Sequence, residues 1–165
     1  MTMAPGRPAL PSHAPMDQFA CAGGELQVGG QSLSALAARI GQTPFYVYDR
    51  RLLRARAVEL RAALPSQVKL HYAMKTNPMP ALICLMATLV DGIDVASAGE
   101  LKVALDAGAD PAEVSFAGPG KRDAELRQAV AAGVLINVES ERELDVLARA
   151  SDELSLPARG ALPVN

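Results

Sequence analysis

From residue 68 onward, short apolar runs alternate with helical patterns, and this alternation restricts the possible folds more than any other feature. Runs typical of buried strands are followed each time by segments with the spacing of amphipathic helices. The predicted strands are Val68–Met74, Gly92–Ala96, Val114–Ala117, Val134–Val138 and Ala158–Val164, and the helical patterns lie near residues 80–90, 98–107, 122–132 and 140–150. Each unit takes about 20 to 25 residues, which is typical of βα repeats in a parallel sheet.

Two architectures contain such repeats, a closed (β/α)8 barrel and an open doubly wound sheet. No GxGxxG sequence follows the first strand, which disfavours a dinucleotide site. Gly108 and Gly133 come directly after two of the helical patterns, where C-cap glycines are expected. We therefore predict an α/β fold, a partial (β/α)8 TIM-type barrel with about five of the eight strands. The sequence stops at Val164-Asn165, so we expect the N-terminal part of a longer enzyme.

The segments before the repeats differ in composition from the rest. Residues 1–18 are rich in Pro and Ala, which predicts a disordered leader. Residues 19–43 are expected to form a strand and a short helix, and residues 44–165 the barrel part. Phe45–Tyr48 predicts one further short strand, and Asp49 is placed to cap the helix that follows it.

Composition excludes several kinds of partner. A net charge of −2 over 165 residues argues against nucleic acid or an anionic membrane surface. The longest apolar stretch, Ala81–Val90, is too short to span a bilayer, and the N-terminus lacks the apolar core of a signal peptide. Cys21 and Cys84 show no metal-binding spacing, and neither do His13 and His71. These features predict a cytoplasmic protein with reduced structural thiols and no metal site.

The first strand of the repeats ends in a lysine, Lys75, which is followed by the turn-forming pair Asn77-Pro78. Strand alternation predicts that His71, Ala73 and Lys75 share one face. A lysine at the carboxyl end of a buried strand lies where α/β enzymes keep their chemistry. Its amine can lose its proton and form a Schiff base with an aldehyde, although a lysine that only reaches solvent is an equal alternative.

Other polar groups follow the later strands. Asp94 ends the second strand, and Glu100 lies in the first turn of the next helix. The third strand leads into the turn Ala117–Lys121, and the fourth ends at Asn137–Ser140. Each alone is compatible with helix capping or a helix-dipole role. Together they predict a polar rim at the carboxyl edge of the sheet, near Lys75.

These motifs together resemble one enzyme family. The segments Tyr72–Asn77, Asp94–Leu101, Ala117–Lys121 and Asn137–Ser140 resemble the N-terminal barrel half of the pyridoxal-phosphate-dependent amino-acid decarboxylases. This family includes the diaminopimelate, ornithine and arginine decarboxylases, which share an alanine-racemase-like barrel. The similarity extends from about Pro44 to Asn165 and is greatest to the diaminopimelate branch.

The resemblance implies roles for individual residues. Lys75 matches the catalytic lysine that holds pyridoxal 5'-phosphate covalently. Asp94, Glu100 and Ala73 match cofactor-binding positions: a carboxylate near that lysine, a glutamate beside the site and a small residue next to the ring. Lys121 and Asn137 match family positions for which we expect structural or rim roles. The implied substrate is a small basic or diamino acid such as meso-diaminopimelate, and the implied assembly is a homodimer.

The sequence also departs from the family. Pro163 stands where the family has an arginine and removes a donor from the expected strand. The resemblance implies that the ring-stacking histidine, the phosphate loop, the glutamate facing the pyridine nitrogen and the C-terminal β-domain all lie beyond Asn165. We therefore expect this chain to be inactive alone. Two alternatives stay open, a pyridoxal-binding relative of the racemase or carrier type and a truncated product without catalysis.

Overall fold

The computed structural model describes residues 16–164, so most of the predicted leader lies outside the described residues. The chain divides into two compact units, one ending at Arg56 and the other starting at Ala57. The division falls within helix α2 (Arg50–Ala63). The boundary predicted at residue 44 stays a prediction.

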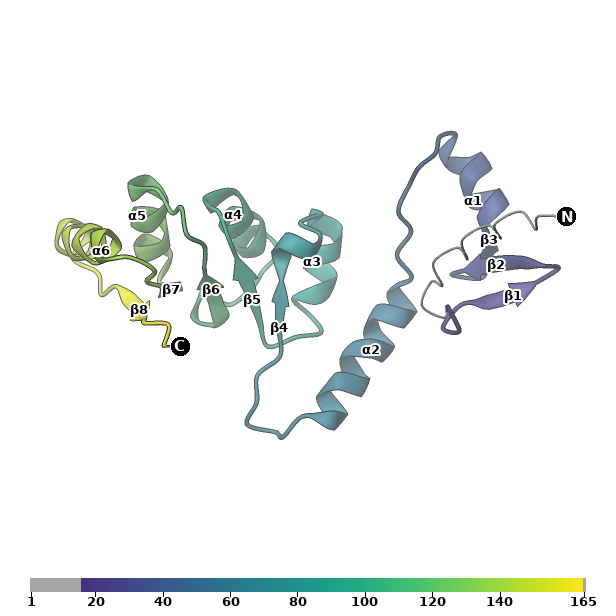
Figure 1. The fold of residues 1–165 in the computed structure, drawn as a ribbon, viewed down its shortest axis with the longest axis horizontal. Coiled ribbons are helices and arrows are strands. Elements are labelled where there is room, and N and C mark those ends of the chain that lie inside the picture. Colours follow the sequence, from purple (N-terminus) through teal and green to yellow (C-terminus); the bar gives the residue numbers. More distant parts are fainter. Residues whose placement is uncertain (1–15, 165) are drawn as a thin grey trace, which may run out of the picture. The chain divides into compact units, whose positions relative to one another are not determined.

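The first unit is a small antiparallel sheet with one helix (Figure 1). Its elements are β1 (Ala20–Ala22), β2 (Glu25–Val28), β3 (Gln31–Ser32) and α1 (Leu33–Ile40). Gly29 and Gly30 join β2 to β3 with φ angles of 60° and 79°, the left-handed conformation that a tight hairpin requires and glycine tolerates. The hydroxyl of Ser32 then accepts a hydrogen bond from the Ala35 N–H and caps α1.

The segment between the two helices corrects one prediction. Phe45–Tyr48 forms no strand, because no neighbouring segment pairs with its backbone in the part of the chain that the structure describes. The expected cap is confirmed, since the Asp49 carboxylate accepts the Arg51 N–H at 2.8 Å and the Gly29 N–H at 3.1 Å. The pKa of Asp49 lies below its usual value, first because of the hydrogen bond from Arg51. Asp49 therefore links the hairpin to the start of α2.

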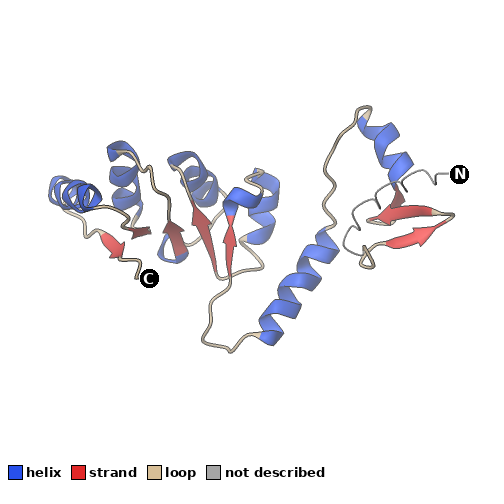
Figure 2. Ribbon diagram, viewed as in Figure 1, coloured by secondary structure: helices blue, strands red, loops and turns tan. Residues whose placement is uncertain are grey.

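The second unit is a five-stranded parallel sheet with helices along one side (Figures 1 and 2). The strand order follows the sequence, β4-β5-β6-β7-β8. The strands are β4 (His71–Ala73), β5 (Gly92–Val95), β6 (Val114–Phe116), β7 (Leu135–Asn137) and β8 (Arg159–Ala161). The helices are α3 (Pro80–Met86), α4 (Ala98–Asp106), α5 (Asp123–Ala132) and α6 (Glu141–Leu154), with 3-10 turns η1 (Met74–Thr76) and η2 (Pro111–Glu113). The predicted partial (β/α)8 barrel is thus confirmed as the fold class.

Several strands are shorter than the apolar runs that predict them. β4 ends at Ala73, because the next three residues turn into η1. β8 ends at Ala161, two residues before Pro163. Proline has no N–H to donate to the ladder, so the run Ala158–Val164 cannot continue as a paired strand. Pro163 thus lies beyond the strand, whereas the sequence had indicated a place inside it.

The core lies between the sheet and its helices. Phe116, Ile93 and Ile136 are at most 1% exposed and pack with buried residues of α4, α5 and α6. Each such side chain contributes about 1.5–3 kcal/mol by leaving water. Because successive residues of a strand face opposite sides, Asp94 and Ser115 lie on the sheet face turned away from these helices. The second face of the sheet therefore carries polar groups.

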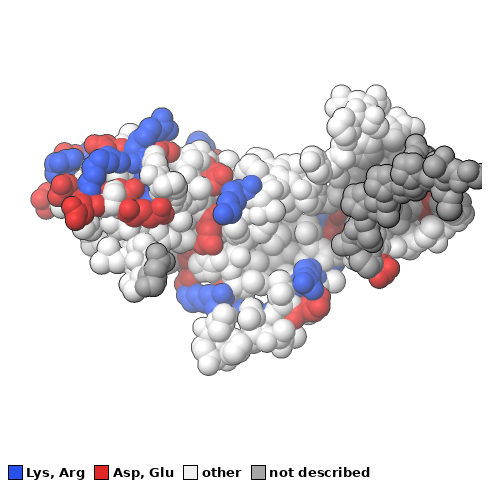
Figure 3. Space-filling model, in the orientation of Figure 1, with Lys and Arg blue, Asp and Glu red and all other residues white. Residues whose placement is uncertain are grey.

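The outer surfaces of α5 and α6 carry charges of both signs (Figure 3). Ion pairs join Arg142 and Arg149 to Asp123, and Arg127 to Glu153. None of the helices in the described residues is long and apolar enough to cross a membrane. Cys21 and Cys84 form no disulfide with each other and are both exposed, so neither packs in the core.

Candidate active site

A short turn presents Lys75 at the carboxyl end of β4. Met74 is fully buried and anchors η1, while Lys75, the next residue, is exposed. The Asn77 N–H donates to the Met74 carbonyl at 3.1 Å, and the Asn77 side chain accepts the Met79 N–H at 3.0 Å. Lys75 thus leaves the sheet from a fixed turn and not from the strand itself. The expected strand thus ends before Lys75, although Lys75 still lines the same cavity as Ala73 and Asp94.

Lys75 differs from the other three lysines of the chain in its partners. Lys69 pairs with Glu113, Lys102 with Asp106, and Lys121 with Glu143. Within residues 16–164, no hydrogen bond or ion pair engages the Lys75 amine. This amine is the lysine group that the fold leaves available for a ligand.

A cavity of about 480 Å³ opens beside Lys75 at the carboxyl edge of the sheet. Its lining comes from the ends of four neighbouring strands and the loops after them, and comprises Ala73, Lys75, Asp94, Val95, Ala96, Ser115, Ala117, Gly118, Pro119, Asn137 and Glu139. Three of these side chains are alanines, which leave room for a ligand. The volume falls in the range of small-molecule and cofactor sites.

Asp94 lies in this cavity with two side-chain partners. Its Oδ1 lies 3.0 Å from His71 Nδ1 and accepts a hydrogen bond from the Ser115 hydroxyl at 2.5 Å. The parallel register places Ala73 beside Asp94, and Asp94 beside Ser115. The three polar side chains therefore come together across three adjacent strands.

Glutamates hold the loops that form the rim. Glu100 Oε2 accepts the Ala96 N–H at 2.7 Å, and Glu139 Oε1 accepts the Gly118 N–H at 2.7 Å. Ser97 caps α4 by accepting the Glu100 N–H, as its position predicts. Each carboxylate satisfies a loop donor that would otherwise have no partner in a helix or sheet. These hydrogen bonds hold the rim loops in place without a ligand.

Glu125 joins the starts of two helices below this rim. Its carboxylate accepts the Ala98 N–H at 3.0 Å, and the Arg122 N–H and side chain, both also at 3.0 Å. These bonds, led by that from the Arg122 side chain, lower the pKa of Glu125 from 4.5 to about 2. Glu125 is therefore a structural anion, because all of its bonds go to groups that build the loops.

Lys121 belongs to a second, buried cluster behind the cavity. Its amine lies 3.2 Å from Glu143 Oε2 and donates to the Gly118 carbonyl at 2.6 Å. Glu143 also accepts the Glu139 N–H at 2.9 Å. The cluster thus fixes both the Ala117–Lys121 turn and the loop after β7. This geometry agrees with the structural role expected for Lys121.

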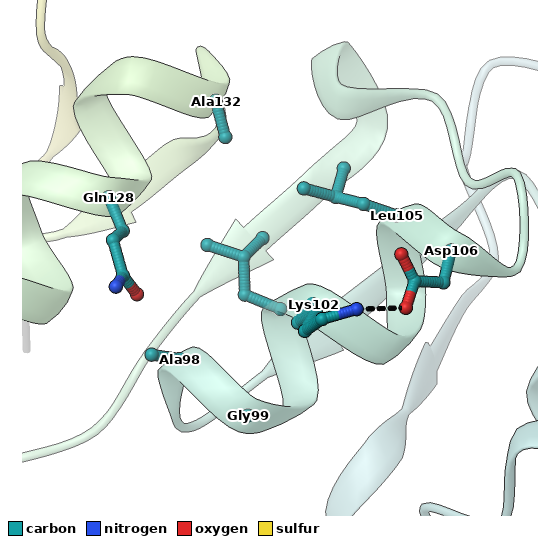
Figure 4. Close-up of a pocket in the computed structure, with 8 residues that line it drawn as sticks. Ala98, Gly99, Lys102, Leu105, Asp106, Gln128 and Ala132 are labelled. Atoms are coloured by element: carbon teal, nitrogen blue, oxygen red, sulfur yellow. Dashed lines mark hydrogen bonds and ion pairs between the residues drawn. The ribbon is translucent and has the colours of Figure 1, made fainter.

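A second hollow, of about 540 Å³, lies on the helical side between α4 and α5 (Figure 4). Leu105 and Ala132 contribute apolar surface to it, and Gln128 lines it from α5. Its two charged residues, Lys102 and Asp106, pair with each other. This hollow therefore offers no available reactive group, in contrast to the cavity at Lys75.

The structure gathers most of the predicted site residues. Lys75, Asp94 and Ala73 line one cavity together with Asn137. Glu100 is not part of its lining, since its carboxylate holds the backbone of Ala96 from behind. Sequence reasoning missed His71 and Ser115 as partners of Asp94. A signal was present in Ser115, a single polar residue between the apolar Val114 and Phe116.

Comparison with known proteins identifies the family. The model of the family described as "Pyridoxal-dependent decarboxylase, pyridoxal binding domain" matches residues 50–163. This chain belongs to the pyridoxal-dependent decarboxylases. The cofactor of this family is pyridoxal phosphate, and the resemblance noted in the sequence is confirmed.

Similar proteins within the pyridoxal-dependent decarboxylases are diaminopimelate decarboxylases. The chain is 42% identical over 143 residues to the enzyme of Aquifex aeolicus, which covers 86% of this chain and 34% of the relative. It is 40% identical over 152 residues to that of Pseudomonas aeruginosa, covering 91% of this chain and 36% of the relative. The chain thus spans about a third of the length of these curated relatives.

Solved structures, among them a diaminopimelate decarboxylase, share the fold. A crystal structure from Aquifex aeolicus matches with a TM-score of 0.84 and 39% identity, covering 91% of this chain and 37% of that one. Diaminopimelate decarboxylase from Helicobacter pylori, complexed with L-lysine, matches with a TM-score of 0.72 and 31% identity, covering 80% and 34% of the two chains. The five strands therefore correspond to part of a decarboxylase barrel.

The residues of the cavity fit the family's cofactor. An amine without a carboxylate partner can attach to an aldehyde, and Lys75 supplies one at the cavity. The small side chains of Ala73, Ala96 and Ala117 leave space for a flat ring, while Asp94 and Asn137 offer polar partners. The donor set and the volume thus suit pyridoxal phosphate.

Proposed function

We propose that this chain holds pyridoxal phosphate through Lys75 and forms the lysine-bearing part of a decarboxylase that acts on diaminopimelate. The observation that carries the proposal is the placement of Lys75: of the chain's four lysines, it lines the cavity and has no carboxylate partner in the described residues. The curated relatives, which are diaminopimelate decarboxylases, support the choice of substrate.

Each residue of the cavity has a task in this proposal. Bound pyridoxal phosphate supplies an electron sink for the electron pair left behind by a departing carboxylate. Lys75 holds the ligand by its amine, and Ala73 leaves room beside it. Asp94 presents a carboxylate to the same space, where it can accept a hydrogen bond from an amine. The backbone at Gly118, held by Glu139, forms part of the cavity wall.

Reductive trapping tests the attachment. The chain is mixed with pyridoxal phosphate, reduced with borohydride and digested, and the modified peptide is identified by mass spectrometry. We expect label at Lys75 in preference to Lys69, Lys102 and Lys121, and loss of the preferred label in Lys75→Ala. Lys102→Ala serves as the matched control, because Lys102 is also exposed but lies on α4 away from the cavity. Equal labelling of Lys69, Lys75 and Lys102 would contradict the proposal.

The second part of the proposal, decarboxylation, is expected to require a longer protein, because the chain spans about a third of the length of its curated relatives. We expect the 165 residues alone to release no carbon dioxide from diaminopimelate, ornithine, arginine or lysine. A chimera in which this chain replaces the matching third of the Aquifex enzyme should decarboxylate diaminopimelate, and Lys75→Ala should abolish that turnover. A folded chimera that binds the cofactor at Lys75 but turns over none of the four amino acids would refute the catalytic part.

We also propose a cytoplasmic location and a homodimer for the assembled enzyme, as the family resemblance implies. Exposed, unpaired Cys21 and Cys84 are compatible with a reducing compartment. Sedimentation of the chimera at several concentrations would test the assembly. A monomer at all concentrations that still turned over diaminopimelate would refute the dimer.

A further inference from the structure

We infer that His71 and Ser115 are positioning residues that aim the Asp94 carboxylate at the Lys75 site. The inference rests on the proposed function, because it concerns the same cavity. It assigns a role to two residues for which neither the sequence motifs nor the family comparison supplies one. The unit consists of His71, Asp94 and Ser115, one residue from each of β4, β5 and β6.

The two donors converge on one oxygen of the carboxylate. His71 Nδ1 and the Ser115 hydroxyl both reach Asp94 Oδ1, at 3.0 Å and 2.5 Å. Among residues 16–164, no hydrogen bond reaches the other oxygen, Oδ2. Two bonds to one oxygen fix the rotation of the carboxylate, so Oδ2 is held ready for a donor in the cavity. Lys75 lines that same cavity.

The hydrogen-bond pattern also determines the tautomer of His71. An ionised carboxylate only accepts hydrogen bonds, so the proton between the two side chains resides on His71 Nδ1. The neutral ring then carries no proton on Nε2. The ring is therefore a directed donor to Asp94, and this state can be measured independently of any ligand.

Gly92 makes room for this arrangement. It pairs with His71 in the parallel register. A methyl group added at Gly92 would lie 2.5 Å from His71 Cε1, 2.6 Å from Nε2 and 2.2 Å from the Glu113 carbonyl oxygen. Real side chains do not approach so closely, so any larger residue would displace the ring or the backbone. The chain thus has a residue without a side chain where the imidazole approaches β5 closely.

The test uses two substitutions that separate the donor's position from its presence. In His71→Asn, the side-chain amide nitrogen stands near the place of Nδ1, whereas in His71→Gln it lies one bond farther out, near Nε2. Both variants remove the ring and keep an amide. A purely structural role for the ring would affect them alike, while a positioning role would not.

The measured quantity is the dissociation constant for pyridoxal phosphate, obtained by absorbance titration of the full chain. We expect His71→Gln and Ser115→Ala to weaken binding on the order of tenfold, the scale on which supporting partners tune a ligating side chain in metal sites. His71→Asn should restore most of the lost affinity. Circular dichroism and thermal unfolding verify that each variant is folded.

Nitrogen NMR on the wild-type chain without ligand gives a second readout. We expect the neutral ring of His71 to carry its proton on Nδ1, and Asp94→Asn to shift the ring toward a mixture of tautomers. His13, the other histidine, is the internal reference in the same spectrum. This readout does not depend on cofactor binding.

The outcomes distinguish this inference from the proposed function. If trapping fails to place the cofactor on Lys75, the proposed function is wrong. If the Nδ1 tautomer is present in that case, the arrangement around Asp94 exists but has no role in binding, which refutes the inference as stated. If trapping succeeds but His71→Gln binds as tightly as wild type, or His71→Asn binds as weakly as His71→Gln, the inference alone is overturned. A proton on Nε2 would also overturn it.

Discussion

Lys121 with Glu143, and His71 with Asp94, are ionisable pairs of the same compact unit, and they differ most in exposure. The side chains of Lys121 and Glu143 are 1% and 2% exposed, whereas those of His71 and Asp94 are 26% and 43% exposed. In the first pair, Lys121 lies in the loop after β6 and Glu143 in the first turn of α6, whereas the second pair lies on the sheet face that carries the cavity. One pair is closed off from water and the other is open to it.

The difference in exposure predicts a difference in task. Removing one partner of a buried ion pair leaves a charge without water or counterion, which costs far more than removing an exposed one. The buried pair therefore acts mainly on stability, by holding the loops. The exposed pair contributes little to stability and remains accessible to a ligand. Substitutions in each pair should separate these two effects.

The largest effect is expected from Glu143→Leu. Lys121 would stay buried with only the more distant Glu139 carboxylate, 3.7 Å away, as its counterion. We therefore expect the free energy of unfolding to fall by about 3 kcal/mol, the lower end of the range for a broken buried ion pair. Urea unfolding followed by circular dichroism measures this loss. A loss below about 1 kcal/mol, which is the range for exposed ion pairs, would show that the two pairs do not differ in their contribution to stability.

The double variant Lys121→Met with Glu143→Leu is the control for this prediction. It removes both charges, so it should be more stable than Glu143→Leu alone, although it carries more substitutions. If both variants lose the same stability, lost packing and not the unpaired charge is the cause.

Acid should destabilise the folded chain through Glu125, a buried carboxylate that bonds to the backbone at the starts of α4 and α5. Its pKa in the folded chain is about 2, below the usual 4.5, so folding favours the ionised form. The resulting stability is fully present above pH 4.5 and is lost as the pH falls toward 2. Urea unfolding at several pH values in this window should show a steeper loss for wild type than for Glu125→Gln, which cannot ionise. Equal slopes would exclude Glu125 as the source.

Much of the fold could be predicted because it depends on local patterns. Apolar runs of strand length, helical spacing and C-cap glycines such as Gly133 are each encoded within a few residues. The errors occur where the outcome depends on a distant partner. Phe45–Tyr48 has the composition of a strand but has no strand to pair with in the described residues.

The candidate site divides in the same way. The position of Lys75 after the first strand could be predicted from the apolar run that precedes it. The partners of Asp94 could not, because the register between β4, β5 and β6 brings together residues 21 and 23 positions apart. The turn η1 that carries Lys75 was also not predicted, since the apolar run continues through Met74 without a signal for the end of the strand. Predicting such contacts requires the pairing of strands and not only their presence.

A smaller effect on stability is expected from Asp94→Asn, on the exposed side of the comparison. The substitution keeps the size of the side chain but removes its charge, and we expect the free energy of unfolding to change by less than about 1 kcal/mol. Cofactor attachment at Lys75 should nevertheless weaken, because the cavity loses its fixed anion. Urea unfolding and the absorbance titration measure the two effects on the same samples. A stability loss as large as that of Glu143→Leu would show that both clusters are structural.

The smallest effect on stability is expected from Lys75→Ala, which should leave the free energy of unfolding close to that of wild type, well inside the range of about 0.5 kcal/mol that is usual for surface substitutions. The Lys75 side chain is exposed and forms no hydrogen bond or ion pair within residues 16–164, so its removal breaks no polar interaction and leaves no buried charge. Lys102→Ala should cost slightly more, about 0.3–0.5 kcal/mol, because it breaks the helical ion pair with Asp106. Thermal and urea unfolding of both variants test this order. If Lys75→Ala unfolded more readily than Lys102→Ala, Lys75 would be contributing to the fold, and its availability to a ligand would no longer follow from its lack of partners.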